Sequence, residues 1–441
     1  MILVDTALQA REMDAMTLNH RYSNAAPHAA CRLCKAPLTT SFVDLGMTPL
    51  CESILAPDQI DQMEPYFPLR VLVCSNCFLV QLRDYVRPET IFTEYGYFSS
   101  YSTSWVEHAR RYCVTMQSRF NLGPNSQVFE IASNDGYLLQ HFVQLGIPVT
   151  GIEPAANVAG AALQKKVPTI VEFFGRELAR RLVSAGKRAD LIIGNNVLAQ
   201  VPDLDDFVGG MAILLGETGV ITLEFPHLEH LIDQNQFDTI YHEHFSYFSI
   251  VTIDRLAKQH ALKVFDVEHL NTHGGSLRVY LCHSGAPYVP SPAVADLLAH
   301  ERRIGFEDIG TYASFSAKVH HTKRQLLSFL IQLKEKGAKL CGYGAPGKAN
   351  TLLNYCGIGT DFLDFTVDRN PYKHGRYTPG MHIPIYPVSA IDDARPDYLF
   401  ILPWNLKQEI VEQMRYVGDW GCKFIVAIPR VEVIDPREAT S

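Results

Sequence analysis

Two Cys-x-x-Cys pairs, Cys31/Cys34 and Cys74/Cys77, constrain the fold of this chain more than any other feature of its sequence. Each pair sets two thiolates on one tight turn, and two such turns facing each other supply the four sulfur ligands of a closed tetrahedral zinc site. The long interval between the pairs is compatible with this, because loop-closure entropy grows slowly with length. Two disulfides or four unrelated thiols are the alternatives, but a chain without an export signal favours zinc. With no open coordination position, the predicted zinc is structural.

Length and charge limit what the chain can be. Its 441 residues, 47% of them hydrophobic, are enough for three units of ordinary domain size. The 39 basic residues against 47 acidic ones give a net charge of −8, which argues against a nucleic-acid partner. Residues 1–24 show neither the apolar core of a signal peptide nor a stretch long enough to span a membrane. We therefore expect a cytoplasmic protein that is not bound to membranes.

The pattern of apolar runs predicts an α/β protein. From residue 127 onward, short buried strands alternate with helices, which is typical of a doubly wound parallel sheet. A second series of the same kind begins near residue 338. We predict a flexible tail at 1–27, a zinc-binding domain at 28–90, and two Rossmann-like doubly wound domains at 91–290 and 291–441. The expected strands are 128–132, 149–152, 189–196 and 220–224 in the first of these two domains, and 338–342, 364–367, 398–402 and 423–428 in the second.

The first α/β domain carries a candidate cofactor turn. The segment from Glu130 to Gly136 puts an acidic residue in a strand and small or polar residues, Ala132 and Asn134, after it, where the backbone passes close to a bound cofactor. Glu153 ends the next strand and suits a hydrogen bond to ribose hydroxyls. The turn lacks the full Gly-x-Gly-x-x-Gly pattern of dinucleotide sites, which favours S-adenosylmethionine.

Another strand of this domain ends in Asn195 and Asn196. These amides either line the same pocket or merely cap the loop.

The segment Tyr241-His-Glu-His244 is the candidate catalytic centre. A phenol, a carboxylate and an imidazole within four positions can provide a base near neutral pH and a group that orients it. Histidines held by structural hydrogen bonds in a half-buried loop are the alternative. The His-Glu-x-x-His pattern of metalloproteases is absent here, which argues against a metal at this segment.

The second α/β domain carries a glycine-rich turn from Gly342 to Thr351, which includes Lys348 and Asn350. Backbone amides at a helix start, together with a lysine, predict a diphosphate site. An acidic residue at 368 makes the turn similar to an NAD site, although a lone glycine turn is a weak signal. His273 stands beside two glycines, in either a tight turn or a substrate clamp, and Asn405 lies at a strand end, where ligands gather.

Taken in order, these segments resemble the bacterial deoxysugar C-methyltransferases, S-adenosylmethionine enzymes that methylate a carbon of a nucleotide-linked 4-keto-6-deoxyhexose. The resemblance covers nearly the entire chain. The matching segments are the two cysteine pairs, 45–49, 97–102, 130–136, 151–154, 241–244, 273–276, 342–351 and 403–405. It implies a zinc-binding N-terminal domain, a central methyl-donor domain and a C-terminal domain, with the sugar nucleotide between the last two. One departure is Gln200, where the family often has a histidine; an amide cannot serve as a base.

The resemblance also implies roles for individual residues. His244 is the first candidate for the base and Tyr241 the second, with Glu243 orienting the imidazole or binding a sugar hydroxyl. The reaction would remove the proton α to the C4 ketone, at C3 in preference to C5, and transfer a methyl group to the enolate. The residues implied in substrate binding are Tyr97, Ser99, His273, Lys348, Asn350 and Asn405.

Other classes of function stay open at this point. The chain could be an NAD-dependent sugar-nucleotide oxidoreductase, a non-catalytic zinc-anchored nucleotide-binding protein, or an O- or N-methyltransferase. The sequence also leaves the oligomeric state open, a monomer included.

Overall fold

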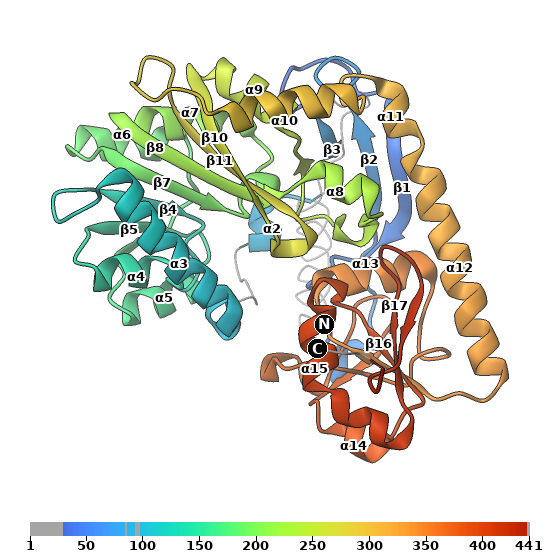
Figure 1. The fold of residues 1–441 in the computed structure, drawn as a ribbon. Coiled ribbons are helices and arrows are strands. Elements are labelled where there is room, and N and C mark those ends of the chain that lie inside the picture. The colour runs from blue at the N-terminus through green and yellow to red at the C-terminus, as the bar shows by residue number, and fades with distance from the viewer. Residues whose placement is uncertain (1–29, 84–85, 93–97, 439–441) are drawn as a thin grey trace, which may run out of the picture.

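The computed structural model describes residues 30–83, 86–92 and 98–438. The predicted flexible tail at 1–27 and the candidate substrate residue Tyr97 lie outside these ranges. The described residues form three sheets with helices around them (Figure 1). The two cysteine turns, at 31–34 and 74–77, belong to the N-terminal part of the chain. The predicted α/β class, with a zinc-binding region before two Rossmann-like sheets, is confirmed.

The N-terminal sheet is antiparallel and is shared between distant parts of the chain. Its strands, in order, are β1 (Thr40–Thr48), β2 (Phe67–Val73), β3 (Val80–Leu82) and β9 (Ser246–Tyr247). Phe42 on β1 stacks on Phe315 with ring centroids 4.5 Å apart, where helix α12 (Phe315–Glu335) runs alongside the sheet (Figure 1). The zinc-binding segment therefore shares a hydrophobic core with the C-terminal region instead of forming a separate cap.

The middle sheet has seven strands in the order β10-β11-β8-β7-β4-β5-β6. The parallel strands are β4 (Val128–Ile131), β5 (Val149–Ile152), β6 (Thr169–Ile170), β7 (Ala189–Asn195) and β8 (Leu215–Pro226). The apolar runs of β4, β5, β7 and β8 are buried on both faces, as expected for a sheet covered by helices on each side. The last two strands at one side of the sheet, β10 (Leu262–Leu270) at the edge and β11 (Ser276–His283) next to it, are antiparallel. The prediction of a wholly parallel sheet was therefore wrong. The loop at His273 is the turn of this hairpin.

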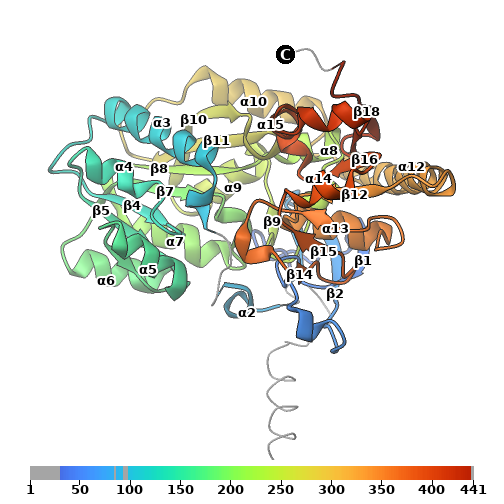
Figure 2. The ribbon, with the colours of Figure 1, turned by 90° about the horizontal axis from the view of Figure 1, so that it is seen from below.

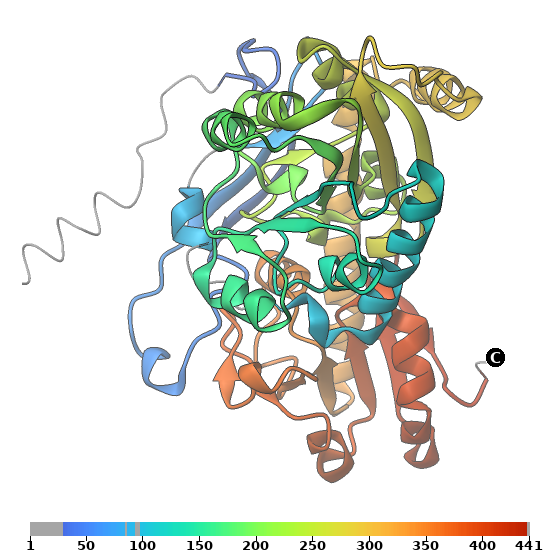
Figure 3. The same cartoon turned by 90° about the vertical axis from the view of Figure 1, so that its left-hand side faces the viewer.

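Helices cover both faces of the middle sheet (Figure 3). One face packs against α3 (Thr103–Phe120), α4 (Leu139–Gln144) and α5 (Ala156–Gln164), and the other against α6 (Arg176–Ser184), α7 (Leu204–Leu214) and α9 (Ile250–Gln259). Helix α10 (Pro292–Arg303) packs on α9 and β10, although the predicted boundary at 290/291 assigns it to the next domain. The proposed division of the chain into domains stays a prediction.

The C-terminal sheet has the order β14-β15-β13-β12-β16-β17-β18, with a parallel centre. Its strands are β12 (Leu340–Tyr343), β13 (Thr366–Val367), β14 (Arg376–Tyr377), β15 (Pro384–Tyr386), β16 (Tyr398–Ile401), β17 (Lys423–Val426) and β18 (Glu432–Ile434). Helix α13 (Gly347–Cys356) follows β12, as the glycine-rich turn predicts. A bridge between Leu55 and Tyr377 and contacts between α13 and β1 join this sheet to the N-terminal segment (Figure 2).

The remaining α-helices are short: α2 (Pro88–Phe92), α8 (Leu228–Asp233), α11 (Ile309–Ala313), α14 (Ala390–Ala394) and α15 (Lys407–Gln413). Across the described ranges, no helix combines the length and apolar character that crossing a bilayer requires.

Candidate active site and zinc centre

The four cysteines of the two Cys-x-x-Cys pairs come together as predicted. Their sulfur atoms all lie within 4.8 Å of one another, with Cys31 Sγ 3.4 Å from Cys77 Sγ and Cys34 Sγ 3.5 Å from Cys74 Sγ. Zn–S bonds of about 2.3 Å in a tetrahedron place sulfurs about 3.8 Å apart, so this donor set fits a structural zinc ion.

Both cysteine turns have the same backbone form. The amides of Lys35 and Phe78, both at positive φ, donate to the carbonyls of Cys31 and Cys74. Arg255 on α9 donates to the carbonyl of Asn76 at 2.9 Å and lies over the ring of Phe78. The zinc centre is therefore docked on the middle domain.

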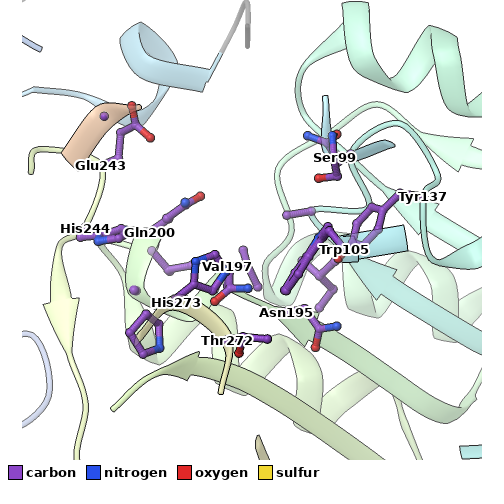
Figure 4. Close-up of a pocket in the computed structure, with 18 of the residues that line it drawn as sticks. Ser99, Trp105, Tyr137, Asn195, Val197, Gln200, Glu243, His244, Thr272 and His273 are labelled. Atoms are coloured by element: carbon purple, nitrogen blue, oxygen red, sulfur yellow. The ribbon is translucent and has the colours of Figure 1, made fainter. Parts of the chain in front are cut away.

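A cavity of about 1180 Å³ lies at the carboxyl ends of the middle-sheet strands and extends to the C-terminal domain. Figure 4 shows its two sides, with Ser99, Trp105, Tyr137 and Asn195 on one and Gln200, Glu243 and His244 on the other. Most of the predicted site residues line it. These are Ser99, Ala132, Asn134, Glu153, Asn195, Asn196, Tyr241, Glu243, His244, His273, Lys348 and Asn405.

The cofactor side of the cavity is rich in hydrogen-bond acceptors. The Oδ1 atoms of Asn195 and Asn196 are buried and have no hydrogen-bond partner among the described residues. The Glu153 carboxylate accepts the amides of Asn134 and Ala155, each at 2.9 Å, and still borders the cavity. Such acceptors fit a ligand with ribose hydroxyls and a positively charged sulfonium and amino group, so they fit S-adenosylmethionine.

Two of the predicted cofactor residues do not reach the cavity lining. Glu130 is buried on β4, where burial and the nearby Glu153 raise the pKa of its carboxyl well above the ordinary value. Gly136 faces Ala162 and Val167, so it serves the packing of the turn against α5. Their role as ligands of the cofactor stays a prediction.

Aromatic residues that the sequence interpretation did not assign to the site complete this side. The indole of Trp105 stacks on His108 and Tyr137, with ring centroids 5.0 and 6.1 Å apart, and meets His273 edge-on. All four line the cavity. The neighbouring segment 97–102, with Tyr97 and Ser99 assigned to substrate binding, was the available signal, but the sequence interpretation did not extend the site to Trp105.

His244 has the geometry of a neutral base. Its Nδ1 lies 2.9 Å from the carbonyl oxygen of Thr239, so Nδ1 carries the proton and Nε2 keeps its lone pair. Burial lowers the pKa of His244 to about 4, and the nearby His273 and Lys348 act in the same direction. The imidazole is therefore unprotonated at neutral pH.

Tyr241 lies against this imidazole, with ring centroids 4.0 Å apart. Burial, reinforced by the neighbouring Cys51 and Glu243, raises the pKa of its phenol well above the ordinary value. A phenol that stays protonated suits a hydrogen-bond donor better than a base. Glu243 also borders the cavity, and its Oε1 lies 3.7 Å from the Cys51 thiol.

His242 is turned away from the cavity. Its Nε2 donates to the carbonyl of Pro68 at 3.1 Å, and its ring packs edge-on against Phe67. His242 is therefore a structural histidine held by a hydrogen bond, which was the alternative to a catalytic role.

The C-terminal domain contributes a cation to the cavity. Lys348, at the start of α13, donates to Asn405 Oδ1 at 2.8 Å, and its ammonium lies 4.8 Å from the centre of the Trp404 ring. Burial lowers the pKa of this lysine, while the nearby Asp238 acts in the opposite direction. Asn350 lies deeper in α13 and binds the carbonyl of Cys51, so it does not line the cavity.

The two glycines after His273 are explained by close packing. Gly274 and Gly275 have φ of +88° and +117°, and a Cβ at either position would collide with the ring of Trp404 or His230. His273 itself has φ of 54° and a buried Nε2 that finds no hydrogen-bond partner in the described part of the chain. The segment is therefore a tight turn that also places His273 at the cavity.

Arg278, on β11 beside the cavity, forms two ion pairs with carboxylates of the same sheet. It pairs with Glu224 at 2.8 Å and with Glu268 at 3.0 Å. His108 and Thr272 bind the same Glu224 carboxylate. This network ties α3 to the β10–β11 hairpin beside the cavity.

The glycine-rich turn is not arranged like a dinucleotide site. The carboxylate of Asp368 accepts the amides of Ala345 and Asn370, both at 2.8 Å, so it is committed to the turn itself. This observation weakens the oxidoreductase alternative.

Comparisons with known proteins agree with this architecture. Three family models match: "Putative zinc binding domain" over residues 31–92, "Methyltransferase domain" over 105–267 and "C-methyltransferase C-terminal domain" over 271–429. The C-methyltransferase NovU of Streptomyces niveus is 35% identical over 408 residues, which are 92% of this chain and 97% of that protein. The chain belongs to the C-methyltransferase family.

Two solved structures with partial similarity to this chain are named as methyltransferases. An S-adenosylmethionine-dependent methyltransferase of Clostridium acetobutylicum has a TM-score of 0.34 at 12% identity, over 40% of this chain and 92% of its own. The magnesium protoporphyrin IX methyltransferase of Synechocystis with bound SAH has a TM-score of 0.32 at 16% identity, over 40% of this chain and 83% of its own.

The family membership and the cavity together define the activity at a coarse level. This C-methyltransferase uses S-adenosylmethionine, and its N-terminal cysteines form a zinc site.

Proposed function

We propose that this C-methyltransferase acts on a nucleotide-linked 4-keto-6-deoxysugar, at C3 in preference to C5. The observation that carries the proposal is one cavity bordered by a neutral imidazole, His244, by the acceptor-rich cofactor side, and by a lysine, Lys348. In this proposal His244 is the base, the cofactor side binds the methyl donor, and Lys348 binds the diphosphate.

The base acts on a carbon that is inert without help. A ring C–H becomes acidic when a neighbouring ketone delocalises the electron pair, so the C–H bond breaks as the proton moves to Nε2 of His244. The protonated phenol of Tyr241 is the candidate donor to the enolate oxygen. S-adenosylmethionine, when bound, supplies an electrophilic methyl group for the enolate carbon.

The middle and C-terminal domains are proposed to hold the methyl donor and the sugar nucleotide next to each other. Glu153, Asn195 and Asn196 are proposed to hold the donor, while Lys348 and the start of α13 hold the diphosphate. Fixing both reactants in one cavity makes the reaction effectively intramolecular, which lowers a barrier by about 7–11 kcal/mol in favourable cases. We further expect the protein to act in the cytoplasm, where sugar nucleotides and the donor are both available.

The test uses a panel of 4-keto-6-deoxysugar nucleotides and S-adenosylmethionine with a ¹³C methyl group, in deuterated water. We expect the label on a ring carbon in the NMR spectrum and exchange of the α-hydrogen with solvent. Label on an oxygen or nitrogen, or turnover without loss of a ring C–H, would overturn the proposal.

A further inference from the structure

A second group of potential metal ligands lies apart from the cysteines. Ligand atoms of His227, His230 and His269 all lie within 4.8 Å of one another. His227 precedes α8, His230 is within α8, and His269 lies near the end of β10. Among the described residues, this is the one such group besides the four cysteines.

His227 is the best-defined member of this group. Its side chain is fully buried, and its Nε2 donates to Oε1 of Glu301 on α10 at 2.7 Å. The Glu301 carboxylate is itself fixed, because it accepts the amides of Ile250 and Val251. With the proton on Nε2, the lone pair of His227 is on Nδ1, which is buried and has no hydrogen-bond partner among the described residues. A carboxylate behind a histidine is the usual outer support of a metal ligand.

The charge around the group also favours a cation. Oε2 of Glu229 lies 3.9 Å from Nδ1 of His227, and Oε1 of the same carboxylate accepts from His300 at 2.7 Å. This places a fixed negative charge at the edge of the three rings. Nδ1 of His230 lies 3.4 Å from the side-chain nitrogen of Gln234, so a metal would bind His230 through Nε2 or replace this contact.

We propose that His227, His230 and His269 bind a divalent transition metal, zinc in the first place, at a site separate from the four cysteines. Three imidazoles beside a carboxylate are ligands that zinc prefers. Zn–N bonds of about 2.0–2.1 Å place ligand nitrogens about 3.3 Å apart, so the rings close inward when the ion binds.

Two of the three histidines connect such an ion to the active site. His230 packs directly on Gly275, in the turn that carries His273, and His269 lines the cavity. The metal would thus join α8, β10 and this turn, which makes it a positioning element for the cavity wall.

The test counts metal ions in the full-length protein. After equilibrium dialysis against micromolar zinc and removal of free ions, we expect one equivalent more than the cysteine site holds. His230→Asn and His269→Gln should each lose that equivalent while keeping the cysteine-bound zinc. His320→Gln, a change at an exposed histidine on α12, is the matched control and should keep both. A wild-type protein that holds only the cysteine-bound ion, or variants that keep the full count, would overturn the proposal.

A second measurement guards against variants that fail to fold. Cobalt added to the wild-type protein with zinc in its cysteine site should give visible bands of nitrogen ligation without a sulfur charge-transfer band. If cobalt produces no such bands, the site does not exist, whatever the variants do.

Discussion

The Nδ1 atom of His244 lies 2.9 Å from the carbonyl oxygen of Thr239, and this contact decides which ring nitrogen is basic. A carbonyl can only accept, so the proton is on Nδ1 and the lone pair on Nε2. The preceding residue, Asp238, accepts from Trp404 Nε1 at 2.6 Å. The C-terminal domain therefore supports the short turn that orients the proposed base.

Replacing His244 by asparagine removes the proposed base and keeps a polar side chain of smaller size. We expect His244→Asn to lower kcat by at least about 10²-fold, because an amide cannot accept the α-proton. Binding of S-adenosylmethionine, measured by calorimetry, should be unchanged. Undiminished turnover would remove His244 from the role of base.

The pH dependence gives an independent check on the same residue. Burial lowers the pKa of His244 to about 4, against 6.5 for the ordinary imidazole, and a base works only when unprotonated. The specificity constant kcat/KM should therefore keep its value at neutral pH as the pH falls through 6.5, and decline only at lower pH. An acid limb centred at or above 6.5 would contradict the assignment.

Tyr241→Phe tests the proposed donor to the enolate. The pKa of Tyr241 is raised well above its ordinary value by burial, so its hydroxyl keeps the proton that a donor needs. We expect a loss in kcat of about 10²–10³-fold, the usual effect of removing one oxyanion donor, together with slower exchange of the α-hydrogen in deuterated water.

The matched control for this change is Tyr247→Phe. The Tyr247 ring lies 6.3 Å from that of His244 but does not line the cavity. Equal losses in both variants would show that Tyr241 acts only through packing.

Much of the fold was predictable because its central strands are short apolar runs buried on both faces. The strand at 149–152 was predicted with its observed bounds, and those at 128–132 and 398–402 within one residue. The pairing of β9 with β3 was not predictable, since two residues carry no periodicity and their partner lies far away in the sequence. The β10–β11 hairpin was missed because no strands were predicted on either side of His273, whose segment was interpreted only as a tight turn or a substrate clamp.

The site residues that could be predicted from the sequence are those at the carboxyl ends of parallel strands. Parallel strands end at the same edge of a sheet, which explains why Glu153 and Asn195 line one cavity. The direction of individual side chains was not predictable. His242 and His244 are two residues apart, yet one binds the carbonyl of Pro68 and the other borders the cavity.

Loss of the cysteine-bound zinc should weaken more than the N-terminal segment. Cys34→Ser removes one of four ligands, and we expect one zinc equivalent fewer per chain and a clearly lower melting temperature. The cysteine turns share a hydrophobic cluster with α9, so the effect should extend to the middle domain. Cys282→Ala, at a buried thiol in a different hydrophobic cluster from the cysteine turns, should leave the zinc content unchanged.

His242 should make the protein sensitive to acid. Burial lowers the pKa of His242 to about 4, so the unfolded chain binds a proton more readily and stability falls as pH decreases below about 6.5. At pH 5 the lowered pKa of His242 reduces the free energy of unfolding by about 2 kcal/mol. In His242→Gln, the drop in melting temperature from pH 7 to pH 5 should be smaller than in the wild type. An identical drop would show that other groups cause the acid sensitivity.

Lys348→Met tests whether the C-terminal domain holds the diphosphate. Lys348 is the lysine that lines the cavity, where it donates to Asn405, and a charged hydrogen bond contributes about 1.5–3 kcal/mol. We expect KM for the sugar nucleotide to rise about 10–100-fold, with the affinity for S-adenosylmethionine unchanged. Lys407→Met removes a lysine that pairs with Glu432 and does not line the cavity, so KM should stay at its wild-type value. A normal KM in Lys348→Met would place the nucleotide elsewhere, because no binding mode that uses this cation could survive its removal.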